Sequence, residues 1–314
     1  MKIIVTGGRG FIGSNLIREL KKLGHNVTCF TRGKSYEKDG VKYVTVNYHD
    51  EKDVKSKLYS EILIHLAATL FARSKKEFIK ENVTSTANLV KAAEDNGIKK
   101  IIYISSLAAG GPSKDPSKPR NEKDRDNPVS FYGLSKLLGE KEVIKFPRWT
   151  ILRPPIVYGP KDDGFSTIAQ WIKRGIMISP QNIDARFSFI FVDDLVRCII
   201  KSFDKSLDGE IFYVCEKNNY SWNEFIEKMA ESIGVKKPKI LKMPKLLLNI
   251  TALSYEIFSY ILNSKPVLNR DKVREAISSH WIADPSKWEE KTKMKNWTDL
   301  SCGLHTTFAQ NSNR

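Results

Sequence analysis

Short apolar runs alternate with helical patterns over the first half of the chain. Five runs, at residues 3–6, 26–31, 41–46, 62–67 and 100–105, predict strands, and 150–152 begins a sixth. Apolar residues at helical spacing predict helices over 11–23, 78–96 and 132–144, the second ending at Gly97. Repeated strand–helix units predict an α/β fold, a doubly wound parallel sheet with helices on both faces.

The second half is more irregular. Helical patterns occur at 162–179, 221–233 and 246–262, and 110–128 has the composition of a long surface loop. Residues 187–204 are expected to return to the sheet. We therefore expect a first domain over 1–155, to which 187–204 returns, and a smaller mixed α/β C-terminal substrate-binding region made of 156–186 and 205–314.

The net charge and the cysteines indicate which binding partners and which cellular compartment to expect. A net charge of +16 attracts anions, but the basic residues are spread along the chain, which favours solvated faces over a nucleic-acid site. The four cysteines lie far apart and form no C-x-x-C pair, so we expect neither a metal site nor a disulfide framework. No signal peptide is recognisable. A cytoplasmic protein without nucleic acid is expected.

The most apolar segment, 246–262, contains Asn249 and Glu256. Those polar residues favour an amphipathic helix, or a lid over a greasy substrate, rather than a transmembrane span. The high positive charge still allows peripheral contact with an anionic membrane.

A glycine-rich loop joins the first strand to the first helix. Gly7 permits a tight turn, Gly10 lets the backbone approach a pyrophosphate, and Gly13 lets the helix pack against the strand. The helix N-terminus then offers free N–H groups to the phosphates. The loop predicts a dinucleotide-binding Rossmann sheet and contributes the candidate contacts Gly7, Arg9, Gly10, Phe11, Ile12 and Gly13.

The end of the second strand indicates which dinucleotide is bound. An acidic residue there would bind the ribose 2′-hydroxyl of NAD, whereas this chain has Thr31 and Arg32. A guanidinium can hold a 2′-phosphate with two hydrogen bonds, and Arg9 could reach the same group. We therefore expect NADP, with NAD as the alternative.

Several further motifs resemble those of one enzyme family. They are TGGRGFIG at 6–13, HLAA at 65–68, ENVTST at 81–86, YISSLAAGG at 103–111, YGLSK at 132–136, LRPPIVYGP at 152–160 and FVDDL at 191–195. Together they resemble the extended short-chain dehydrogenase/reductases, the NAD-dependent epimerase/dehydratase family. The spelling of SSLAAGGP and LRPPIVYGP is most similar to the 3β-hydroxysteroid dehydrogenase and dihydroflavonol reductase branch.

The resemblance implies roles for particular residues. Ser106, Tyr132 and Lys136 match the catalytic set, and no metal is implied. The implied cofactor contacts are Asn47 near the adenine, Tyr48 beside it in sequence, Leu66, Ala67 and Ala68 beside the ribose, and Pro154, Ile156 and Val157 at the nicotinamide. Family members often pair through the helices at 78–96 and 132–144, so a homodimer is expected.

Tyr132 and Lys136 are four residues apart and share one helix face. A nearby ammonium favours the phenolate, so Tyr132 can exchange a proton with a substrate hydroxyl or carbonyl. Ser106 would bind the substrate oxygen. Asp193 and Asp194 form a pair of carboxylates of the kind used in acid–base catalysis, but we expect them to cap the N-terminus of the helix that follows.

The motifs allow three functions. The favoured one is an NAD(P)-dependent oxidoreductase that interconverts a hydroxyl and a carbonyl on a small organic substrate. The alternative is a nucleotide-sugar epimerase or dehydratase, disfavoured because Ile156 and Phe187 stand where those enzymes usually have Asn and Arg, although Arg186 is one position away. The third, a non-catalytic nucleic-acid module, lacks basic motifs interleaved with aromatics.

Overall fold

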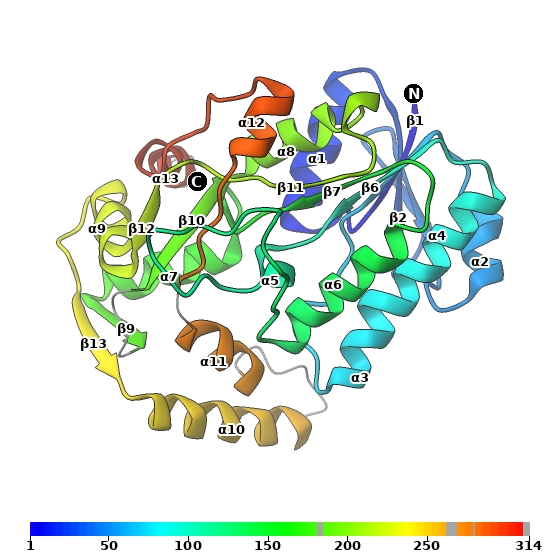
Figure 1. The fold of residues 1–314 in the computed structure, drawn as a ribbon. Coiled ribbons are helices and arrows are strands. Elements are labelled where there is room, and N and C mark those ends of the chain that lie inside the picture. The colour runs from blue at the N-terminus through cyan, green and yellow to red at the C-terminus, as the bar shows by residue number, and fades with distance from the viewer. Residues whose placement is uncertain (181–184, 262–268, 279, 310–314) are drawn as a thin grey trace. The chain divides into compact units, whose positions relative to one another are not determined.

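The computed structural model describes residues 1–180, 185–261, 269–278 and 280–309. The chain forms two compact units (Figure 1). The first comprises Met1–Ala109, Phe131–Arg153 and Val196–Phe212. The second comprises Gly110–Ser130, Pro154–Leu195 and Tyr213–Arg314.

A mostly parallel sheet is the centre of the first unit. Among the described residues it has eight strands, in the order β11-β7-β6-β5-β1-β2-β4-β3. Their bounds are β1 (Lys2–Thr6), β2 (Asn26–Thr31), β3 (Tyr36–Lys38), β4 (Val41–Thr45), β5 (Ile62–His65), β6 (Lys100–Ile104), β7 (Trp149–Arg153) and β11 (Glu210–Tyr213). The strand order reverses at β1, which pairs in parallel with both β2 and β5. The predicted doubly wound Rossmann sheet is confirmed, and its switch point lies between β1 and β5.

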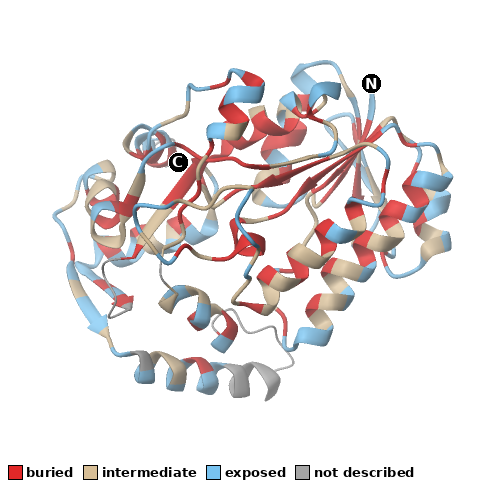
Figure 2. Ribbon diagram, viewed as in Figure 1, coloured by how far each residue is buried: buried red, intermediate tan, exposed pale blue. Residues whose placement is uncertain are grey.

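Helices cover both faces of this sheet, with α2, α4 and α6 on one face and α1 on the other (Figure 1). The helical elements are α1 (Phe11–Lys22), α2 (Glu51–Lys57), α3 (Lys75–Phe78), the π-helical segment η1 (Ile79–Thr84), α4 (Ser85–Asp95), α5 (Leu107–Gly110), α6 (Phe131–Val143), α8 (Val192–Lys201) and the 3₁₀ turn η2 (Lys205–Leu207). The central strands are buried, as Figure 2 shows, because helices shield them on both sides.

The helix predicted at 78–96 differs from the regular one expected. It begins at Lys75 and passes through η1 before continuing as α4. Within η1, the Asn82 side chain is buried and hydrogen-bonded to neighbours outside the helix. π-Helical insertions of this kind are frequent at functional sites.

The second unit contains two small sheets and a set of helices. β8 (Ile156–Tyr158) pairs in parallel with β10 (Arg186–Phe191), and β10 pairs antiparallel with β12 (Asn219–Ser221). β9 (Ile176–Pro180) and β13 (Lys239–Met243) form a parallel pair. The helices are α7 (Asp163–Lys173), α9 (Trp222–Ser232), α10 (Lys245–Ile261), α11 (Arg270–Ile277), α12 (Ser286–Thr292) and α13 (Leu300–Ala309).

The helix predicted at 162–179 is wrong over its last part. α7 ends at Lys173, and Gly175 has a φ of 78° that stops the helix. β9 follows the glycine. Met177 and Ser179 are buried and Ile176 and Ile178 are exposed, an alternation that is typical of a strand.

Residues 187–204 also differ from expectation. β10 lies in the three-stranded sheet, and only the part from Val196 onward groups with the large sheet. Asp194 is in the first turn of α8 rather than before it, so it is not the helix cap. Its buried carboxylate accepts hydrogen bonds from the backbone N–H and hydroxyl of Thr298.

The apolar segment predicted as a helix at 246–262 forms α10, whose last predicted residue, Leu262, is outside the described residues. No described helix is long and apolar enough to cross a bilayer.

A buried carboxyl in the second unit provides a test of this packing. Burial, with Asp299 and Asp194 nearby, raises the pKa of Glu216 to about 8, and Tyr220 donates its hydroxyl to this carboxyl at 3.0 Å. Because its pKa is raised, the protonated Glu216 carboxyl stabilises the fold at pH values below the ordinary carboxyl pKa. This contribution is lost as the pH rises through about 8.

We expect Glu216→Gln to gain stability relative to the parent protein as the pH rises. The gain should grow by about 2–4 kcal/mol between roughly pH 5 and pH 8, measured by urea unfolding. Equal pH dependence in the two proteins would contradict the burial of an ionisable Glu216.

Candidate active site

The glycine-rich loop has the shape that a pyrophosphate requires. Gly7 has a φ of 72°, and the Gly10 N–H donates to the Gly7 carbonyl at 3.0 Å, which closes the turn. A Cβ on Gly13 would lie 2.3 Å from the Gly7 oxygen, so only glycine permits this approach of α1 to the loop. The first-turn N–H groups of α1 have no partner within the helix and can bind phosphate oxygens.

A hydrogen-bond network joins the carboxyl ends of β1 and β5 at the switch point. Burial and the nearby Lys136 lower the pKa of His65 to about 3, so the imidazole is neutral. Thr86 donates its hydroxyl to the Asn82 carbonyl, so it accepts from His65 Nε2, and His65 Nδ1 in turn accepts from the Thr6 hydroxyl. These bonds fix the His65 tautomer.

The same network reaches the loop after β5. The Ala67 N–H donates to Thr6 Oγ1 at 3.1 Å, and the Leu66 N–H donates to the Thr6 carbonyl at 3.3 Å. A Cβ on Gly7 would lie 2.8 Å from the Ala67 nitrogen. The glycine loop and residues 66–68 are therefore held against each other at the place where a dinucleotide binds in this fold.

Asn82 connects this network to the helix that carries Tyr132. Its side chain exchanges hydrogen bonds with the backbone of Thr69 and donates to Ser135 Oγ at 2.9 Å. Ser135 donates its hydroxyl to the Tyr132 carbonyl at 2.7 Å. Sequence reasoning included Asn82 only as a letter of the ENVTST motif, and its buried contacts give it a positioning role.

Lys136 is the most constrained charged residue of the site. It is 1% exposed, donates to the Ile104 carbonyl at 2.8 Å and lies 4.1 Å from the centre of the Tyr103 ring. Helix α6 comes this close because Gly139 faces Tyr103, where a Cβ would lie 2.5 Å from the phenol oxygen. Burial lowers the pKa of Lys136 to about 7.

A buried ion pair lies one helical turn beyond Lys136. Arg153, the last residue of β7, binds both carboxylate oxygens of Glu140, at 2.9 and 2.6 Å. The Glu140 carboxylate stabilises the Lys136 ammonium and so raises its pKa, which opposes the lowering by burial. Because Arg153 already binds that carboxylate, Lys136 can direct its hydrogen bonds elsewhere.

Two serines follow β6. Ser106 accepts from the Ala108 N–H at 3.1 Å at the start of α5, which leaves its hydroxyl proton able to bind a substrate oxygen. The Ser105 hydroxyl is buried and has no hydrogen-bond partner among the described residues. Because Lys136 binds Ile104, the residue before Ser105, these polar groups gather at the carboxyl end of β6.

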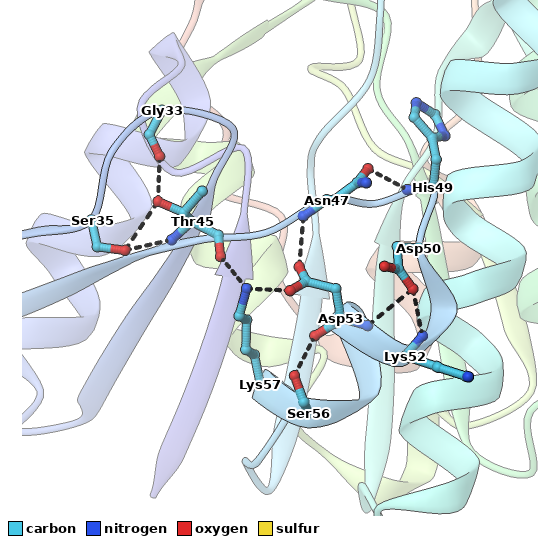
Figure 3. Close-up of polar contacts among 10 residues, drawn as sticks. All are labelled: Gly33, Ser35, Thr45, Asn47, His49, Asp50, Lys52, Asp53, Ser56 and Lys57. Atoms are coloured by element: carbon cyan, nitrogen blue, oxygen red, sulfur yellow. Dashed lines mark hydrogen bonds and ion pairs between the residues drawn. The ribbon is translucent and has the colours of Figure 1, made fainter.

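The loop after β4 holds Asn47 in place (Figure 3). Asp53 accepts from the Asn47 N–H at 2.8 Å, and Asn47 Oδ1 accepts from the His49 N–H at 3.1 Å. The amide oxygen therefore already has one donor within its own loop. The Tyr48 ring packs in the hydrophobic cluster around Val54, and this packing accounts for its burial.

Arg32 lies at the end of β2, as predicted. Its exposed guanidinium forms an ion pair with Glu81 at 3.3 Å, and Glu81 also contacts His49 at 3.2 Å. Arg9 lies close to Gly33, with Nη1 3.2 Å from the position of an added Cβ. The predicted residues Pro154, Ile156 and Val157 belong to the second unit.

The sequence model of the NAD dependent epimerase/dehydratase family matches residues 3–215. The chain belongs to this family. It is accordingly an NAD(P)-dependent enzyme of the extended short-chain dehydrogenase/reductase type, and the resemblance to the NAD-dependent epimerase/dehydratase family inferred from the motifs is confirmed.

Curated members of the epimerase/dehydratase family resemble most of the chain. The UDP-glucose 4-epimerase of Vibrio cholerae is 26% identical over 284 residues, covering 85% of this chain and 84% of that protein. The ceramide reductase of Caulobacter vibrioides is 24% identical over 300 residues, covering 93% and 89%. The relatives thus differ widely in substrate.

Solved structures share the fold. The UDP-glucose 4-epimerase of Thermotoga maritima gives a TM-score of 0.81 at 22% identity, covering all of both chains. MoeE5 in complex with UDP-glucuronic acid and NAD gives 0.80 at 21% identity, covering 100% of this chain and 99% of MoeE5.

Replacing the buried lysine should separate activity from stability. A lysine with a folded pKa of about 7 opposes folding at neutral pH, and this cost disappears as the pH rises toward its ordinary value. We expect Lys136→Met to abolish turnover and yet to raise the free energy of unfolding by about 1–3 kcal/mol near pH 7, with a smaller gain near pH 10.

Urea unfolding of the cofactor-free proteins at several pH values measures this effect. Lys141→Met, an exposed position on the same helix, serves as the matched control and should change stability little at any pH. A Lys136→Met protein that is less stable than the parent at every pH would show that burying Lys136 does not oppose folding.

Proposed function

We propose that the chain transfers a hydride between NAD(P) and the carbon of a hydroxyl or carbonyl group on an apolar or semi-polar small molecule. The observation that carries the proposal is the buried Lys136 ammonium, held at the carboxyl end of β6 on the same helix face as Tyr132. When bound, the dinucleotide supplies or accepts the hydride.

The residues of the first unit would divide the remaining work. Lys136 lowers the cost of forming the Tyr132 phenolate, so that Tyr132 can take a proton from an alcohol or return one to a carbonyl oxygen. Ser106 donates to the same oxygen and stabilises developing charge. Ser105, with its unpartnered hydroxyl, is proposed as a second donor to the cofactor or the substrate.

The choice of substrate class rests on the second unit, which we propose binds the substrate and contributes Pro154, Ile156 and Val157 to the nicotinamide site. Ile156 and Phe187 place apolar groups where nucleotide-sugar enzymes usually have Asn and Arg. Among the relatives, the ceramide reductase and the sterol demethylase protein B of Methylococcus capsulatus are named for lipid substrates.

A nucleotide-sugar epimerase is the second candidate, favoured by the similarity to the UDP-glucose 4-epimerase of Vibrio cholerae. The residue that could replace the missing arginine, Arg186, is engaged with its neighbours. It donates to the Asn219 backbone at 2.8 Å and lies 3.6 Å from Glu224. A tightly bound UDP-sugar in the purified protein, detected by mass spectrometry, would favour this candidate.

The activity test is a screen of ketones and alcohols, including long-chain and sterol-like compounds, followed by the absorbance of the reduced cofactor. We expect turnover with an apolar carbonyl compound and a loss of about 10²–10⁴-fold in kcat for Tyr132→Phe, with unchanged cofactor binding. Failure of every carbonyl compound to consume reduced cofactor would contradict the reductase, and unchanged kcat in Tyr132→Phe would contradict the role of the phenol.

For the cofactor we propose NADP over NAD. The Arg9 guanidinium lies beside Gly33, the Arg32 guanidinium pairs with Glu81, and no acidic residue occurs at the end of β2. A 2′-phosphate would compete with Glu81 for the Arg32 guanidinium. NAD remains the alternative, because MoeE5, which shares the fold, was solved in complex with NAD.

We expect Arg32→Ala to weaken NADP binding roughly 10–100-fold while NAD binding changes little, because one charge-assisted contact to the 2′-phosphate is lost. Isothermal titration with each cofactor measures the two affinities. Arg18→Ala, an exposed arginine on α1, is the control. Equal losses for both cofactors would contradict 2′-phosphate recognition by Arg32.

We also propose a cytoplasmic homodimer. The four cysteines are free thiols, as expected in a reducing compartment. Pairing through α4 and α6 is the arrangement that the family resemblance implies.

A further inference from the structure

Helix α10 exposes apolar side chains to solvent. Leu246, Ile250 and Leu253 are spaced by four and three residues and are 73%, 51% and 41% exposed. Leu247 and Tyr255 are also exposed, whereas Ala252 is fully buried. An ordinary solvated helix would carry charged residues on this face, and residues 246–255 contain none.

The strand pair that leads into α10 shows a second apolar surface. Ile176, Ile178 and Leu241 are each more than 40% exposed, and Leu241 lies opposite Ile178 in the β9–β13 register. Trp171, at the end of α7, is 43% exposed. Tryptophan and tyrosine are the aromatic residues that favour a membrane–water interface.

Exposed basic residues lie close in sequence to these apolar side chains. The exposed set is Lys173, Arg174, Lys236, Lys237, Lys239 and Lys242. Segments 171–180 and 235–255 contain no aspartate or glutamate, although acidic residues are frequent in the rest of the chain. The guanidinium of Arg174 lies 5.6 Å from the centre of the Trp171 ring. Segments 171–180 and 235–255 are therefore both apolar and positively charged.

We propose that this surface, made of the outer side of α10 and the β9–β13 pair and called here the α10 surface, binds an anionic lipid bilayer peripherally. The leucines and isoleucine of α10 enter the headgroup region, and the lysines of β13 contact lipid phosphates. Each lysine near an anionic surface strengthens binding electrostatically, and the buried apolar side chains add to it.

Charge complementarity favours lipid over a second copy of the chain. Two copies that met through this surface would bring twelve cationic side chains together with only Glu227, which pairs with Lys237, as a nearby counter-charge among the residues named here. Like charges at a close interface are costly. An anionic bilayer neutralises the same groups and accepts the apolar face.

The experiment is sedimentation of the full-length protein with phosphatidylcholine vesicles that contain or lack phosphatidylglycerol. We expect binding only to the anionic vesicles, and loss of binding at about 0.5 M NaCl because salt screens the lysines. Leu246→Glu/Ile250→Glu should reduce binding at least about tenfold, and Lys239→Gln/Lys242→Gln about 30-fold.

The matched control is Leu23→Glu/Tyr59→Glu, which adds the same two charges at exposed apolar positions of the first unit and should bind like the parent. Thermal unfolding confirms that each variant is folded. Absence of binding to anionic vesicles, or equal loss in the control, would overturn the proposal. So would a lipid-free dimer that Leu246→Glu/Ile250→Glu converts to monomer, because a second copy would then occupy the surface.

Discussion

The burial of one lysine governs the organisation of the first unit. An ammonium removed from water needs hydrogen-bond partners, and Lys136 finds the Ile104 carbonyl and the face of Tyr103 at the end of β6. This contact requires α6 to lie very close to the sheet, which the missing side chain of Gly139 permits. Helix α6 is thereby held close to the strand that leads into Ser105 and Ser106.

The polar groups around Lys136 form a connected system rather than separate contacts. Thr6, His65 and Thr86 join the glycine loop to η1, and Asn82 and Ser135 extend the chain to the backbone of Tyr132. Because buried polar groups are costly when unpaired, such a network specifies one arrangement of its members. The π-helical segment Ile79–Thr84 contains Asn82, whose side chain makes hydrogen bonds outside its own helix.

The two units differ in where their apolar residues lie. The first buries apolar strands on both faces, so its sequence pattern is regular, and polar contacts join the residues at the carboxyl ends of β1, β5 and β6. The second carries exposed leucines and lysines that an isolated globular surface has little reason to keep. Membrane attachment would bring an enzyme to apolar substrates that are dilute in water, which links the proposed surface to the proposed substrate class.

The sequence by itself determined the doubly wound sheet, the glycine loop and the family, because strand periodicity and glycine spacing are local properties. The limits of β2 agree with its predicted range, and the glycines at 7 and 13 have the close contacts that their motif requires. Only the tertiary structure decided the burial of Lys136, the Glu140–Arg153 pair and the Asp194–Thr298 contact, because these depend on residues far apart in sequence. It also decided that 176–180 is a strand, since pairing with β13 overrides the helical pattern.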